Sequence, residues 1–445
     1  MPREDTITAM TRFGCGVTPD QTDAVDADPR GWLDRQLVSV NSTPASFAGL
    51  PPFIERIDLF SSKRGPDNKT DDELEARRVL RWQFNEKIAQ ARISAAIDSS
   101  FPLQERLVHF WFSHFTISTL VGGVVGVADI YENRSIRPHI LGRFRTMLGA
   151  VVSDPMMLTY LDNTVSVGPN SVTGKTSSKG LNENLARELL ELHTLGVEGG
   201  YTQRDVISLA KILTGWSTTS VTADDAMEFR FVAGWHEPGD KELLGRKIVE
   251  SGEDEVRAAL DILAASPKTA RHIARKLVTH FVSDIPPDDL VNALEQRFID
   301  TDGDLRAVTQ ALIEHPGSWV PQRTKALPPE DWAVALARLI GVDGETAAPG
   351  LQVAITQLGQ KIYGARSPQG WPEAASAWLT PETVIARAAW GRKIASDLPA
   401  DTDVRVLIAL WGMNENEEAG RAIAGAPSQA DAIALLAASP QFSFR

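Results

Sequence analysis

Two glutamates at helical spacing are the side chains in this sequence best suited to acid/base chemistry. Glu188 and Glu191 lie in the leucine-rich segment 181–193, and at about 100° per residue they share one stripe of a helix with Asn184. Arg187 flanks that stripe. A carboxylate on a mostly apolar helix needs a partner or a chemical role, so both glutamates are candidate acids, bases or metal ligands. Asn184 and Arg187 are candidate binding groups.

The alternative for these glutamates is a structural network that ties the helix to its neighbours. In either case we expect both carboxylates to be mostly buried. We also expect them to be hydrogen-bonded to Arg187, to another basic group, or to the helix that carries Glu105.

A second polar group falls in the segment 103–115, which also has helical spacing. On a helix, Glu105 and His109 lie four residues apart on one face and would form an acid/base couple or a hydrogen bond. His114 lies on the opposite, apolar face, where we expect a core histidine. It would point into a cleft only if the helix unwound by residue 112. Glu105 and Asp162 are the candidates for the second carboxylate of a catalytic pair.

Tryptophan is the most informative aromatic residue, with eleven copies against four tyrosines. Indole rings offer flat apolar faces that suit sugar rings, although most tryptophans serve core packing. Trp216 and Trp235 are candidate binding residues. His236 joins them because it lies beside Trp235 in a loop bracketed by glycine and proline, where binding groups are common.

Two further groups of side chains have spacing that fits a binding role. Trp371 and Trp378 lie close together in the sequence. His272, Lys276 and His280 recur every fourth residue and therefore share one face of a helix. Such a face either binds an anion or is a solvated basic stripe.

Composition excludes several classes of protein. The formal net charge of −13 and the absence of clustered lysine and arginine argue against a nucleic-acid groove. The single cysteine excludes an internal disulfide framework and a cysteine-based zinc cluster. There is no His-Glu-X-X-His motif, and no apolar window reaches the length of a signal peptide or a membrane span. The chain as written is predicted to be soluble and cytoplasmic, or periplasmic if an export signal was removed.

Helical periodicity dominates the remaining sequence, and β-branched alternation is confined to 229–232 and 247–249. We therefore predict an all-α protein, a large multi-helix assembly with long loops and little β structure. Loops are expected at 61–72 and at 164–180, the second as a flap over the Glu188 helix or as a plain surface loop. The polar stretch 341–350 is expected to separate a main domain, 1–340, built around the 181–195 helix, from a smaller helical region, 341–445. The predicted helices are 76–99, 103–115, 181–195, 203–213, 254–265, 270–282, 287–298, 305–314, 329–339, 381–395 and 429–438.

Several motifs spread over nearly the whole sequence resemble the bacterial domain-of-unknown-function 1800 family. The resemblance implies no assigned chemistry, and it implies a possible partner, because members are often encoded beside a secreted protein that resembles sulfatases and phosphatases. The family pattern has His-X-His where this sequence has Phe112-Ser113-His114, which argues against a metal held by that pair. The motifs are Thr11–Gly14, Glu105–Phe115, Tyr160–Asn163, Asn182–Gly196, Gly199–Gln203, Leu213–Trp216, His236–Gly239, Ala274–Leu277 and Gly370–Pro372.

Three functions remain open on these observations. The first is a cofactor-independent hydrolase or lyase of envelope or exported polysaccharide, in which Glu188 or Glu191 works with Glu105 or Asp162. The second is a metal-dependent enzyme that draws on His114, Glu188 and His236. The third is a non-catalytic helical scaffold that presents or matures a sulfatase-like partner. Paired carboxylates facing a cleft would favour an enzyme, and an exposed apolar surface would favour the scaffold.

Overall fold

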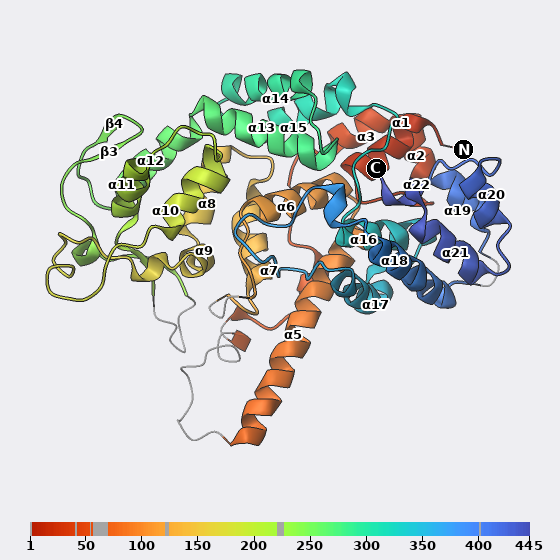
Figure 1. Cartoon of the computed structure of the whole chain (residues 1–445), viewed down its shortest axis with the longest axis horizontal. Coiled ribbons are helices and arrows are strands. Elements are labelled where there is room, and N and C mark those ends of the chain that lie inside the picture. The colour runs from red at the N-terminus through yellow and green to blue at the C-terminus, as the bar shows by residue number, and fades with distance from the viewer. Residues whose placement is uncertain are drawn as a thin grey trace.

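The fold consists mainly of helices, with two small antiparallel sheets (Figure 1). A computed structural model describes residues 2–40, 42–53, 55–56, 70–120, 124–219, 227–399 and 402–445. The predicted all-α class is confirmed. Helices α13 to α15 lie along one side of the molecule, α10 to α12 and the strands at one end, and α18 to α22 at the other, where the two termini also lie.

The helices of the first half surround α6, which lies at the centre of the molecule. Their bounds are α1 Glu4–Thr8, α2 Thr22–Ala27, α3 Pro29–Arg35, α5 Asp71–Asp98, α6 Pro102–His114, α7 Ala128–Tyr131, α8 Phe144–Ser153, α9 Pro155–Tyr160, α10 Asn184–Glu188 and α11 Gln203–Leu213.

The second half completes the layer over α6 and adds the C-terminal helices. Their bounds are α12 Asp254–Ala264, α13 Pro267–Phe281, α14 Asp288–Asp300, α15 Leu305–Glu314, α16 Pro329–Ile340, α17 Gly344–Gln357, α18 Pro381–Ile394, α19 Val404–Leu410, α20 Glu418–Ala424, α21 Gln429–Ala438 and α22 Pro440–Ser443.

Local capping sets several of the helix starts. Thr202 and Asp205 form a capping box at the start of α11, which has the predicted bounds. Thr70 and Glu73 form another, so α5 begins at Asp71, earlier than the predicted residue 76. The first turn of α5 is polar and therefore lacks the apolar spacing on which the prediction depended. Of the predicted loop at 61–72, residues 61–69 lie outside the described residues.

The polar stretch 341–350 is helical from Gly344 onwards. Gly341 ends α16 in the left-handed region, at φ 72°. Asp343 then caps α17 by accepting a hydrogen bond from the backbone N–H of Thr346 at 2.9 Å. Helix α17 packs against both α5 and α16. The division of the chain into 1–340 and 341–445 stays a prediction.

Both predicted strand segments are strands, and each has a partner that alternation alone did not indicate. Strand β2 (Phe229–Phe231) pairs with β1 (Trp216–Thr218), and β4 (Arg246–Ile248) pairs with β3 (Lys241–Leu243). Strands β1 and β3, with the sequences Trp-Ser-Thr and Lys-Glu-Leu, lack the β-branched alternation by which β2 and β4 were recognised.

The core is continuous from the N-terminal helices to α22 and is richest in large side chains around α6 and α16. Trp111 of α6 stacks on Phe115 with ring centroids 5.9 Å apart. Trp332 of α16 is fully buried and donates its indole N–H to the carbonyl of Ala437 at 2.9 Å. Among the helices described, none combines the length and apolarity that a membrane crossing requires.

Candidate active site

Four segments that lie far apart in the sequence surround a cleft of about 820 Å³. They are the end of α6, the π-helical turn η6 (Leu189–Thr194) that continues α10, the middle of α13, and the segment 359–378, which we call the tryptophan strap. The side chains with chemical potential on its walls are Ser113, His114, Glu191, His272, Lys276, Arg366, Gln369, Trp371, Glu373 and Trp378.

His114 is both a core histidine and a residue of the cleft wall. Helix α6 continues to His114, so no unwinding at residue 112 is needed to bring it there. Its Nε2 lies 3.1 Å from the carbonyl of His193, and its ring packs on Phe115 with centroids 4.4 Å apart. Burial, with Lys276 nearby, holds the pKa of His114 well below its usual value. The imidazole is therefore neutral at pH 7.

The π-helical turn η6 sets the direction of Glu191. The backbone N–H of Leu195 bonds to the carbonyl of Leu190 at 3.0 Å, a spacing of five residues. Such an extra residue rotates the side chains that follow, and these turns are frequent at functional sites. Glu191 lines the cleft and accepts a hydrogen bond from the hydroxyl of Tyr201 at 3.1 Å.

The expected burial of the two glutamates is wrong, and among the described residues neither has the expected hydrogen bond to Arg187, another basic group or the helix that carries Glu105. Glu188 and Glu191 are both half-buried. Arg187 instead donates to Glu183 at 3.0 Å and to Gln203 at 3.1 Å. Burial and the charge of Glu191 raise the pKa of Glu188.

Helix α13 presents its basic face to the cleft and to the core, which excludes the solvated stripe. His272 lies with Nε2 3.0 Å from the carbonyl of Leu192, and burial lowers its pKa to about 4. Lys276 is partly exposed to the cleft, and the surrounding protein lowers its pKa to about 8. Among the hydrogen bonds and ion pairs of the described residues, none involves the Lys276 ammonium.

The tryptophan strap closes the cleft opposite α13. The rings of Trp371 and Trp378 have centroids 5.9 Å apart, and the indole N–H of Trp378 donates to the carbonyl of Pro372 at 2.8 Å. Gly370 has φ 81°, and a Cβ there would lie 2.3 Å from the carbonyl oxygen of Ser113. Glycine is therefore required for the strap to approach α6 this closely.

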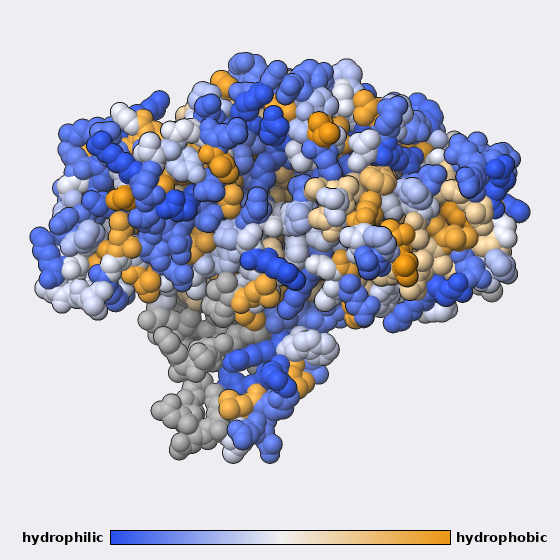
Figure 2. All heavy atoms as spheres, viewed as in Figure 1, coloured by the Kyte–Doolittle hydropathy of each residue, from blue (hydrophilic) through white to orange (hydrophobic). Residues whose placement is uncertain are grey.

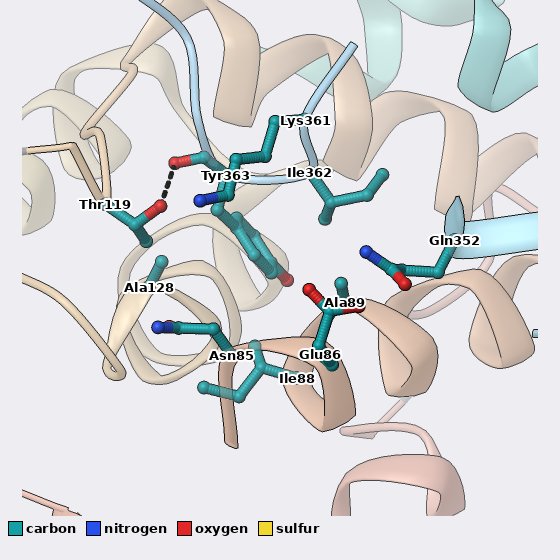
Figure 3. A pocket seen from close by; sticks show the side chains of 10 residues that line it. All are labelled: Asn85, Glu86, Ile88, Ala89, Thr119, Ala128, Gln352, Lys361, Ile362 and Tyr363. Carbon is teal, nitrogen blue, oxygen red and sulfur yellow. Dashed lines mark hydrogen bonds between the residues drawn. The ribbon is translucent and has the colours of Figure 1, made fainter. Parts of the chain in front are cut away.

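The start of the strap is fixed by Tyr363, which has φ 56°, a conformation that bulky residues rarely adopt. Its carbonyl accepts bonds from the N–H and the hydroxyl of Thr119, at 2.8 and 3.0 Å. Its ring points into a small pocket of about 10 Å³ beside Glu86 and Ile88 (Figure 3). Its hydroxyl donates to Glu132 at 3.2 Å. These bonds hold the strained residue in place.

Behind the cleft lies a smaller pocket of about 50 Å³, which shares Ser113, Trp371 and Glu373 with it. His109 lines this pocket with its Nδ1 3.8 Å from Glu330. Glu105 instead makes a bidentate ion pair with Arg137, at 2.6 and 2.8 Å. The expected couple of Glu105 and His109 is therefore not formed, because each has a different partner.

The other predicted site residues lie outside the cleft. Asp162 is exposed in a left-handed turn at φ 56°. Trp216 is buried against Phe229, with ring centroids 4.7 Å apart. Trp235 has the Lys179 ammonium 4.1 Å from its ring centroid. Asn184 is exposed at the first position of α10.

His236 belongs to a separate buried network. Its Nδ1 lies 2.9 Å from the carbonyl of Thr214 and its Nε2 lies 3.0 Å from Glu255, which also pairs with Lys241 at 2.8 Å. The metal-ligand set of His114, Glu188 and His236 is thus not assembled. Within the described ranges, no three His, Cys, Asp or Glu side chains are grouped so that they could hold a metal ion. The loop 164–180 is held by Glu237, which accepts bonds from the backbone and side chain of Asn170, and it does not line the cleft.

Arg366 is a cleft residue that the sequence did not single out, whereas Lys276 and the tryptophans of the strap were identified only as members of two separate groups. Lys276 stood in the basic face and Trp371 in the tryptophan pair, but neither pattern indicated that the two meet. The signal in the sequence that could have brought these residues together was the set of family motifs. Four of them contribute to the cleft walls: 105–115, 182–196, 274–277 and 370–372.

The fold and the site define an all-α protein with a cleft lined by indoles, a lysine and two carboxylates. The chain belongs to the family described as protein of unknown function DUF1800, which residues 8–444 match. No curated protein and no solved structure matches it.

Proposed function

We propose that this protein is a cofactor-independent hydrolase or lyase of polysaccharide, with the cleft as its active site. The observation that carries the proposal is that Glu191 and the indole pair Trp371 and Trp378 line one cleft. Indole faces pack on the C–H faces of sugar rings. Carboxylates deliver or accept the proton when a glycosidic bond breaks. A volume of about 820 Å³ has room for more than one sugar ring.

Glu191 is the proposed acid/base group because it is the predicted catalytic carboxylate on the cleft wall. The hydroxyl of Tyr201 orients it at 3.1 Å. Glu188, one turn earlier, adds negative charge beside it. Glu105 is neutralised by Arg137 and Asp162 stands on an exposed turn, so neither supports a second catalytic role.

The test is Glu191→Gln, which keeps the shape and the bond from Tyr201 but removes proton transfer. New reducing ends and unsaturated products are measured on a panel of neutral and acidic polysaccharides. Turnover should fall about 10²- to 10⁴-fold. The matched control is Glu198→Gln, at an exposed position a few residues on, which should keep full turnover. Equal turnover by both variants would refute the role of Glu191, and no turnover by the wild-type protein on any polymer would refute the enzyme.

A non-catalytic scaffold for a sulfatase-like partner is the second candidate, and one observation favours it. Helix α5 projects away from the body of the molecule, and apolar side chains are visible on its surface (Figures 1 and 2). Trp82 is 63% exposed and Leu80 is 51% exposed. Exposed apolar side chains that gather into a contiguous patch are typical of interaction surfaces. Trp82→Ser should weaken binding of the partner while Glu191→Gln leaves it unchanged; the reverse result would count against the scaffold.

A further inference from the structure

Lys276 is a cation in direct contact with no carboxylate among the described residues. Its ammonium has no hydrogen bond or ion pair among the described residues, although it lies within a wall of the cleft. Nearby lie the rings of His114, His193 and His272, whose pKa values are lowered by burial and by the charge of Lys276. Because burial keeps these imidazoles neutral, none of them adds or cancels charge at pH 7.

The two carboxylates of the cleft are already engaged. Glu373 accepts from His280 Nδ1 at 2.8 Å and pairs with Lys325 at 2.9 Å. The negative charge of Glu373 raises the pKa of Lys276, but burial lowers that pKa by more, so it stays below the ordinary lysine value. Glu191 accepts a hydrogen bond from the Tyr201 hydroxyl at 3.1 Å. The only other charged side chain on the walls is Arg366, an exposed cation in the strap.

A partly buried ammonium without a counter-ion is destabilising unless a ligand supplies the missing charge. The histidines cannot supply it, since a neutral imidazole carries no negative charge. Lys276 lines the cleft and is partly exposed, so a counter-ion can reach the ammonium from the cleft. Arg366, in the strap, gives that ligand a second positive contact.

We propose that the cleft selects an acidic sugar, whose carboxylate or sulfate group pairs with Lys276 while Arg366 contacts it or the next residue of the chain. The sugar component of this inference rests on the proposed function. The anion component rests on the unpartnered ammonium alone. Anionic groups bound to lysine form charge-assisted hydrogen bonds, which are about twice as strong as neutral ones.

Proton uptake follows from the same geometry. An anion beside Lys276 favours the protonated amine, and the free protein has a Lys276 pKa of about 8. Above pH 8 the complex should therefore take up a proton from solvent when it forms. A neutral oligosaccharide that stacks only on Trp371 and Trp378 should take up none.

The experiment is titration calorimetry with three probes of equal length: an oligouronate, a sulfated oligosaccharide and a neutral glucan oligosaccharide. Each is titrated at pH 8.5 in two buffers of different ionisation enthalpy. The acidic probe should bind about 10- to 100-fold more tightly than the neutral one, with proton uptake. Whether the oligouronate or the sulfated probe binds more tightly identifies the anionic group.

The variant is Lys276→Met, and the matched control is Arg275→Met, which removes a cation from the exposed face of the same helix. Lys276→Met should lose the preference for acidic probes and the proton uptake, whereas Arg275→Met should keep both. Lys276→Arg, which keeps the charge, should retain the preference if the site is electrostatic. Equal affinity of the wild-type protein for acidic and neutral probes would overturn the inference and leave the proposed function standing.

A second measurement separates the two proposals. Acylation of Lys276 is followed by mass spectrometry with and without acetate or inorganic sulfate. Slower acylation with either anion, when no oligosaccharide binds, supports the anion site and contradicts the carbohydrate function. Unchanged acylation together with no oligosaccharide binding contradicts both.

Discussion

The Nδ1 atom of His280 lies 2.8 Å from a carboxylate oxygen of Glu373, and this contact joins α13 to the tryptophan strap. The other oxygen of Glu373 pairs with Lys325, whose side chain is fully buried. One carboxylate thus links the core helix, the buried lysine and the segment that carries Trp371. The position of the indoles in the cleft depends on it.

Glu373→Gln should loosen the strap. The amide keeps the shape but leaves Lys325 with only Asp284 as a charged partner, at 2.8 Å. Loss of a partner from a buried charged group costs about 1–3 kcal/mol. Chemical denaturation should show that decrease, and the fluorescence of Trp371 and Trp378 should change, while Glu198→Gln should show neither. A variant as stable as the wild-type protein would mean that the strap is held by other contacts.

Gly370→Ala and Gly350→Ala should change stability in opposite directions. At Gly370 the added Cβ would meet the Ser113 carbonyl at 2.3 Å and the backbone has φ 81°, so the unfolding free energy should fall. Gly350 lies within α17 with open space around it, so alanine should raise the unfolding free energy by about 0.5–1 kcal/mol. Thermal melting of both variants provides the measurement, and a stabilised Gly370→Ala would show that the strap does not lie against α6 in solution.

Acid should destabilise the fold through its buried histidines. Burial lowers the pKa of His193 to about 3 and that of His272 to about 4, against about 6.5 in an unfolded chain. Between pH 6.5 and 4 the unfolded chain therefore binds protons that the folded chain does not, and the unfolding free energy decreases as the pH falls.

Glu132 acts in the opposite direction, since burial raises its pKa to about 7. The test therefore compares a variant with the wild-type protein. His272→Asn should lessen the dependence of the unfolding free energy on pH by at most about 1.4 kcal/mol per pH unit. Denaturant midpoints at pH 4.5, 5.5 and 6.5 measure it. Parallel pH curves for the variant and the wild-type protein would show that the pKa of His272 is the same in the folded and unfolded states.

Lys276→Met should stabilise the protein in the absence of ligand. The methionine side chain keeps most of the apolar contacts of lysine and removes an unpaired charge. For the wild-type protein, the depressed pKa of about 8 means that the unfolded chain holds more protons between pH 8 and 10.5. Its unfolding free energy should therefore rise over that range, and the rise should be absent in the variant. A lower melting temperature for Lys276→Met at pH 7 would show that the ammonium has a partner in the folded protein.

Local sequence determined the helical class and many of the helix limits. The capping box of Thr202 and Asp205 and the apolar spacing that follows gave α11 its bounds. These features act within one turn or along one face of a helix, so they can be recognised without any knowledge of the rest of the chain. The short strands β1 and β3 lacked such a signal because their pairing partners lie farther along the sequence.

The candidate site was predictable only in part. Glu191 and His114 were identified from their types and spacing, and both line the cleft. Glu105 was identified for the same reason, but it faces Arg137, a residue 32 positions away. Spacing along a helix shows which residues share a face, but not what that face meets.

Tertiary structure alone decided that Lys276 and Trp371 share the walls of one cleft. The strap that carries Trp371 has no periodicity of its own, and its position depends on Gly370 against Ser113 and on Glu373 against His280. These contacts join residues that are 93 or more positions apart. The pKa of Lys276 also depends on the surrounding protein and not on its neighbours in the sequence, because desolvation is a property of the packed site.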